Sequence, residues 1–216
     1  MQITYLGHSS FKIKTATATI VTDPFAKNVG LKFPKTEADI VTISHAHQNH
    51  DFREGIKNEN AFIIDGPGEY EIKEVMIKGI RSKISKDEQA TFDPNIIFQF
   101  ETEGGLTLCH LGDLNRELTK KEIEELENTD ILLIPVGNHQ TIGAEMAKKI
   151  IKTLEPSIVI PMHYQQAGLA PEFAQLDSVE TFLKEMEIEP KQEERLVINS
   201  TSLPEELEVV VLERKS

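Results

Sequence analysis

The pattern of apolar residues changes near residue 112, and this change limits the fold more than any other feature of the sequence. Before it, short apolar segments alternate with polar residues at a period of two, which is typical of β-strands. After it, apolar strands alternate with helical patterns, which is typical of α/β proteins. The strands expected in the first part include residues 3–5, 11–13, 19–21, 38–44, 62–64, 75–80, 96–100 and 106–109.

The second part of the chain contains clear helix signals. Thr119 and Glu122 form a capping box, and Leu118 is placed to pack against Ile123, so a helix is expected to begin there. Further helices are expected at residues 144–154 and 179–186, and strands at 131–135, 157–161, 196–198 and 207–212. Because no internal repeat or linker is found, we interpret residues 1–216 as a single domain.

The composition argues against several classes of protein. No apolar stretch approaches the roughly 18 residues that span a bilayer, and the N-terminal segment lacks the pattern of an export signal. A single cysteine, Cys109, provides no intramolecular disulfide, so we expect a cytoplasmic protein. The formal net charge of −13 argues against nonspecific binding of nucleic acid, which requires clustered Lys and Arg.

Histidines follow directly after apolar strands. The segment HAHQNH at residues 45–50 follows the strand expected at residues 38–44 and carries three imidazoles within six residues. Two other expected strands lead into polar residues in the same way, at His110 to Asp113 and at His163. Strand ends are where a rigid scaffold displays chemistry, and imidazole suits zinc, iron or manganese. The sequence therefore predicts a metal centre.

The segment at residues 45–50 resembles the H-x-H-x-D-H signature of the metallo-β-lactamase superfamily. Further segments resemble its lactonase-like branch, the relatives of L-ascorbate-6-phosphate lactonase. The resemblance covers residues 1 to about 165 and implies an αββα four-layer sandwich, a variety of α/β fold, with the metal centre at one edge. The matching segments, in order, are LGHS at residues 6–9, DPF at 23–25, GPGEYE at 66–71, HLGDL at 110–114, PVG at 135–137 and PMHY at 161–164.

The same resemblance implies a set of metal ligands. His45 and His47 would hold a first ion, and His50 and His163 would hold a second. Asp113 would bridge the two ions and is a catalytic candidate.

Four more residues are expected beside this centre. His8 and Asp23 match positions near the site, where Asp23 could orient an imidazole by accepting its distal N–H. Glu69 is a candidate substrate contact. His110 is interpreted as a packed histidine in preference to a ligand.

The chain departs from the family pattern at two ligand positions. Asn49, also a catalytic candidate, stands where the family has Asp, and a neutral amide is a weaker donor than a carboxylate. Arg81 occupies or neighbours the place of a further family histidine, and a guanidinium does not ligate a metal. We therefore expect one ion, or weak occupancy, of Zn²⁺, Mn²⁺ or Fe²⁺.

Two hypotheses about function remain. The first is a metal-dependent hydrolase that cleaves a small ester, lactone or phosphorylated metabolite through metal-bound hydroxide. The alternative is a catalytically impaired or inactive homologue that acts as a binding or assembly protein, with Arg81 attracting an anion. A nuclease of this fold would need a basic groove, which the acidic composition disfavours. The expected partner is a small molecule, anionic in the second case, and a homo-oligomer is left open.

Overall fold

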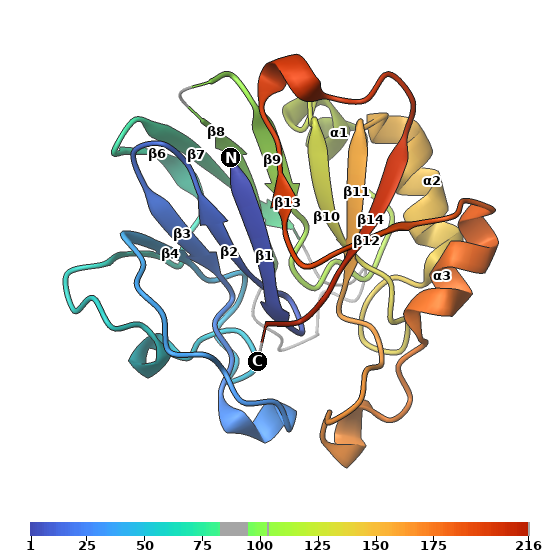
Figure 1. Cartoon of the computed structure of the whole chain (residues 1–216), viewed down its shortest axis with the longest axis horizontal. Helices are drawn as coiled ribbons and strands as arrows, with labels where there is room; N and C mark the ends of the chain where they lie inside the picture. Colours follow the sequence, from blue (N-terminus) through green and yellow to red (C-terminus); the bar gives the residue numbers. More distant parts are fainter. Residues whose placement is uncertain (83–94, 103, 216) are drawn as a thin grey trace.

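The computed structural model describes residues 1–82, 95–102 and 104–215, whose strands form two sheets (Figure 1). The first sheet has the order β13-β1-β2-β3-β4-β5. Its β13, β1, β2 and β3 pair antiparallel, and β3, β4 and β5 pair parallel. The strands are β1 (Gln2–Gly7), β2 (Ser10–Lys14), β3 (Thr19–Thr22), β4 (Ile40–Thr42), β5 (Phe62–Ile64) and β13 (Leu196–Val197).

The second sheet has the order β12-β14-β11-β10-β9-β8-β7-β6. Neighbours from β6 to β9 pair antiparallel, whereas those from β9 onward pair parallel. The change of pattern near residue 112 therefore corresponds to the change from antiparallel to parallel pairing after β9. The strands are β6 (Gly68–Ile72), β7 (Val75–Ser82), β8 (Asn95–Glu101), β9 (Thr107–His110), β10 (Ile131–Pro135), β11 (Ile158–Met162), β12 (Lys191–Glu193) and β14 (Glu208–Leu212).

The three α-helices of the described residues lie on the side of the second sheet (Figure 1). They are α1 (Lys120–Glu125), α2 (Ala144–Leu154) and α3 (Val179–Met186). The predicted capping box is confirmed, because Thr119 accepts the Glu122 N–H while the Glu122 side chain accepts the Thr119 N–H. Short 3₁₀ helices complete the list, namely η1 (Lys27–Val29), η2 (Arg53–Gly55), η3 (Pro171–Phe173) and η4 (Ser200–Ser202).

Alternate residues of the first sheet belong to two apolar clusters. Ile20 and Ile40 join the large core that includes the second sheet and the helices, whereas Val21 and Val41 join a smaller one. Because successive strand residues point to opposite faces, the smaller cluster covers the outer face. There Phe25, Phe33 and Phe173 come from loops and from η3. The predicted two-sheet α/β sandwich is confirmed, with loops and 3₁₀ helices forming this outer layer in the described part of the chain.

Two polar segments form strands that the periodic pattern did not indicate. One is β6, which begins at Gly68 within the GPGEYE segment. The other is β12, whose three residues are all exposed, and it pairs with β14. Among the described residues, no helix is long and apolar enough to cross a membrane.

The segments after β3 and β11 extend beyond the same end of the sandwich, where Figure 1 shows η1 and η3. They meet there, since the Ala170 N–H donates to the Val29 carbonyl at 2.9 Å. This end carries the histidines.

Candidate metal centre

The loop after β4 brings two of its three histidines together. The N–H groups of His50 and Asp51 both donate to the His47 carbonyl at 2.8 Å, which closes a tight turn. The rings of His45 and His50 lie 4.2 Å apart between centroids. His47 is exposed, and its ring stacks at 6.1 Å on the outer side of His45. The turn therefore directs His50 inward and His47 toward solvent.

Three residues of the centre have left-handed backbone conformations. His8, Asp23 and His163 have φ angles of 55°, 40° and 52°. Such conformations cost about 1–3 kcal/mol each for residues other than glycine and persist where the surroundings enforce them. Here the His163 N–H donates to the His8 carbonyl at 2.9 Å, and the Tyr5 hydroxyl donates to the same carbonyl at 3.0 Å. Some of the backbone strain of the protein therefore lies where these side chains meet.

One carboxylate oxygen lies at the centre of the histidines. Asp113 Oδ2 is 3.2 Å from His50 Nε2, 3.6 Å from His163 Nε2 and 3.8 Å from His45 Nε2. Donors around a tetrahedral ion, each about 2.0–2.1 Å from it, lie about 3.3–3.4 Å from one another. The spacing therefore suits groups that share a cation.

Asp113 is held by a residue that the sequence analysis missed. The Asn95 side chain accepts the Asp113 N–H at 2.9 Å and donates to the Leu111 carbonyl at 2.9 Å. Gly112, with φ of 58°, allows this approach, because a Cβ there would lie 2.2 Å from Asn95 Oδ1. Asn95 lies far from Asp113 in the sequence and belongs to none of the matching motifs, so the sequence pattern could not predict its role.

Asp23 orients His50 from the other side. Its Oδ2 lies 2.8 Å from His50 Nδ1, and it also accepts the Ser44 N–H at 2.8 Å and the Ser44 hydroxyl at 2.6 Å. A carboxylate at Nδ1 holds the proton there and leaves Nε2 to face Asp113. The predicted orienting role of Asp23 agrees with this geometry. Ser44, directly before the histidine motif, is the second partner of Asp23, and the sequence pattern did not indicate this role.

The electrostatics of the cluster favour a positive charge between the carboxylates. Burial opposes a charged imidazole at His50, but Asp113 and Asp23 outweigh it and raise the pKa of His50 to about 10. Burial and the neighbouring His50 charge lower the pKa of His45 to about 4. Burial likewise lowers the pKa values of His8 and His163. These three imidazoles are therefore neutral near pH 7, the form that binds a metal.

The cluster also contains buried polar atoms that have no hydrogen-bond partner within the described structure. They are both ring nitrogens of His8 and of His163, His50 Nε2 and Asp113 Oδ1. Two overlapping groups of donors lie within 4.8 Å of one another in this part of the chain, namely His8, His50 and His163, and His45, His50 and Asp113. Unpaired buried donors and acceptors are costly, so these residues fit a divalent cation.

The other predicted site residues lie outside these two groups. Asn49 is buried, and its side-chain oxygen accepts the Asn28 amide at 2.9 Å. Glu69 and Arg81 are exposed on β6 and β7. His110 Nε2 lies 2.8 Å from the Ser9 carbonyl, and its Nδ1 accepts the Gly112 N–H at 3.2 Å, as expected of a packed histidine.

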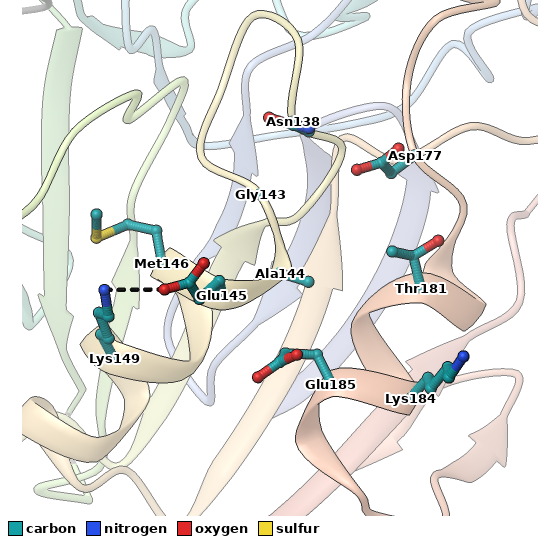
Figure 2. A pocket seen from close by; sticks show the side chains of 10 residues that line it. All are labelled: Asn138, Gly143, Ala144, Glu145, Met146, Lys149, Asp177, Thr181, Lys184 and Glu185. Carbon is teal, nitrogen blue, oxygen red and sulfur yellow. Dashed lines mark ion pairs between the residues drawn. The ribbon is translucent and has the colours of Figure 1, made fainter.

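A surface pocket of about 640 Å³ lies between the loop before α2, α2 itself and α3 (Figure 2). None of its lining residues is a histidine. Three of its charged side chains have partners, since Glu145 pairs with Lys149 and Glu185 pairs with Lys148, both at 3.1 Å. The pocket therefore does not resemble the donor cluster, and we assign it no role.

Solved structures share the fold. A candidate Zn-dependent hydrolase of the metallo-β-lactamase superfamily from Thermotoga maritima is 37% identical, with a TM-score of 0.80 over 99% of both chains. Igni18, a metallo hydrolase from Ignicoccus hospitalis, is 22% identical, with a TM-score of 0.67 over 100% of this chain and 96% of the other. The fold and the site together therefore define a protein of the metallo-β-lactamase-fold class.

The family follows from the sequence comparisons. The model of the β-lactamase superfamily domain matches residues 2–163, and the chain belongs to this family. The UPF0173 metal-dependent hydrolase of Lysinibacillus sphaericus is 30% identical over 196 residues, which is 76% of this chain and 85% of the relative. The resemblance to the metallo-β-lactamase superfamily is thereby confirmed, and with it the broad class of metal-dependent hydrolase.

Proposed function

We propose that this chain hydrolyses a small ester, lactone or phosphorylated metabolite with one divalent cation bound at the histidine cluster. The observation that supports this most is the approach of three imidazoles, two from the loop after β4 and one from the segment after β11, to one oxygen of Asp113. Zn²⁺, Mn²⁺ or Fe²⁺ suits such nitrogen and oxygen donors. A bound cation of this kind supplies Lewis acidity and lowers the pKa of water toward about 7.

The role proposed for each residue follows from its position in the site. His50, His163 and Asp113 would hold the cation, and Asp23 lies beside His50 Nδ1, where it fixes the ring. The side chains of His45 and Asp113 are 14% and 15% exposed, whereas those of His50 and His163 are fully enclosed. Substrate therefore reaches the cation from the side of His45.

Nucleophilic catalysis by a side chain is a poorer explanation of the same site. The Ser44 hydroxyl lies 3.1 Å from His45 Nδ1, but it is buried and donates its hydrogen bond to Asp23. Cys109 is buried as well, and burial raises the pKa of its thiol. Neither group is an accessible nucleophile with a free base beside it.

A second candidate function is the binding of a small anionic molecule without turnover. Asn49 supports it, because an amide replaces the expected carboxylate and its oxygen already accepts a hydrogen bond from Asn28. Both functions have a small molecule as partner. We place either one in the cytoplasm, which fits a chain with a single cysteine.

Metal content and turnover separate the two functions. The protein is purified without chelators, its metal is measured by mass spectrometry, and hydrolysis is followed on a panel of esters, lactones and phosphate esters. We expect close to one ion per chain, turnover that chelation abolishes, and loss of both in Asp113→Asn. His139→Asn, an exposed change outside the cluster, serves as the control. Bound metal without turnover would favour the binding function. Absence of bound metal after loading would contradict both the proposed cation site and the proposed hydrolase activity.

A further inference from the structure

His8 is a buried histidine without a hydrogen-bonding role in the described structure. It is 1% exposed, and neither ring nitrogen has a partner among the described residues. Its ring lies 4.1 Å from that of His163 and 5.1 Å from that of His50, measured between centroids. Phe173 and Phe25 close its other sides at 5.2 and 6.5 Å.

Packing alone does not account for an imidazole at this place. A buried polar group without a partner costs about 1–3 kcal/mol, and an apolar ring would fill the same space without that cost. The backbone of His8 is also held in a left-handed conformation by the hydrogen bonds that its carbonyl accepts from His163 and Tyr5. The left-handed backbone at His8 therefore directs its unpaired imidazole toward the rings of His163 and His50.

We propose that His8 is a metal ligand that, with His50, His163 and Asp113, completes the cation site. This inference rests on the proposed function. His8 supplies a donor from the buried side, where the ligand atoms of the three histidines lie within 4.8 Å of one another. It compensates for Asn49, whose side-chain oxygen is engaged by Asn28.

The assignment has a consequence for the coordination number. Four side-chain donors already complete a tetrahedral site, and a closed tetrahedral site is typical of structural zinc. Because the side chains of His45 and Asp113 remain partly exposed, the open position that hydrolysis requires would lie on their side of the site. His8, His50 and His163 would then hold the cation from the buried side of the site.

Titration calorimetry with Zn²⁺ and the visible absorption of bound Co²⁺ test the assignment. The variant is His8→Asn, because asparagine tolerates the left-handed conformation. His139→Asn is the matched control, since His139 is exposed and also left-handed, with φ of 42°. Loss of residues that only support a ligand costs about 10–100-fold in affinity. We expect His8→Asn to lose more than about 100-fold and to change the Co²⁺ spectrum, whereas His139→Asn matches the wild type.

A measurement on the wild-type protein guards against a variant that fails to fold. In protein labelled with ¹⁵N-histidine, one ring nitrogen of His8 is expected to shift on addition of Zn²⁺, together with those of His50 and His163. Wild-type affinity and an unchanged spectrum in His8→Asn, or an unshifted His8 ring, would overturn the assignment while leaving the proposed function in place. If the wild type binds no ion at all, both fail.

Discussion

Replacing Asp23 with asparagine tests how much the orientation of His50 contributes to metal binding, because it leaves the proposed ligands unchanged. The carboxylate of Asp23 accepts a hydrogen bond from Ser44 Oγ and holds the proton of His50 on Nδ1. Asparagine keeps the shape and tolerates the φ of 40° at this position. Its amide nitrogen is a donor, however, and where it faces Nδ1 it favours the tautomer of His50 that carries its proton on Nε2. That proton occupies the lone pair that would bind a cation.

The magnitude follows from these contacts. Loss of a carboxylate behind a ligating histidine costs about 10–100-fold in metal affinity, or about 1.4–2.7 kcal/mol. Hydrogen bonds to charged groups contribute about 1.5–3 kcal/mol each, but the variant also removes a buried charge and retains an acceptor for the Ser44 N–H. We therefore expect the free energy of unfolding to fall by about 1–3 kcal/mol.

Titration calorimetry with Zn²⁺ and urea denaturation measure the two effects. Asp39→Asn is the matched control, because Asp39 also accepts a backbone N–H, that of Thr19 at 2.8 Å, but lies outside the cluster. Ser44→Ala removes one hydrogen bond to Asp23 while keeping the charge, so its metal affinity should fall by less than about tenfold. Wild-type affinity in a folded Asp23→Asn protein would refute the tautomer argument.

Three further changes test other parts of the structure. Glu122→Gln should lower the free energy of unfolding by about 1–2 kcal/mol at pH 7, because Glu122 caps α1 and pairs with Arg116 at 2.7 Å. Burial opposes the charged form of Glu122, but Arg116 and Thr119 outweigh it and lower the pKa of its carboxyl. The greater stability of the wild type is therefore present above the pKa of Glu122 in the unfolded chain and is lost as the pH falls through its pKa in the folded protein. A difference in urea midpoint between the two proteins that is the same at pH 7 and pH 4 would contradict this. Gly112→Ala should cost roughly 2–4 kcal/mol in urea denaturation, from the left-handed φ and the collision with Asn95, and an unchanged midpoint would show that the loop adapts freely. Asn49→Asp should raise the affinity for Zn²⁺ in calorimetry by adding a carboxylate to the loop, and no gain would mean that the side chain at this position cannot reach the cation.

Local signals explain how much of the fold could be predicted. α2, α3, β5 and β10 occupy the expected residues, because each has a strong apolar period or run, and Thr119 caps α1 as its motif predicts. β12 could not be predicted in this way. Its residues Lys191–Glu193 are all polar and exposed, and they form a strand only because β14 provides a partner.

The candidate site divides along similar lines. The positions of His45, His50 and His163 near Asp113 agree with the expectation that strand ends converge. The direction of each side chain was not readable from spacing. His47 belongs to the same motif, yet the hydrogen-bonded turn leaves it in solvent.

The left-handed residues have a consequence for the stability of the protein. His8, Asp23 and His163 each occupy a conformation that glycine or asparagine adopts at lower cost. Replacements that relieve such strain can stabilise a fold while removing a functional group. Laboratory evolution for heat resistance alone should therefore accumulate glycine and asparagine at His8 and His163, whereas Asp23 should be kept for its hydrogen bonds to Ser44 and His50. The ability to bind a cation would then disappear before the fold does.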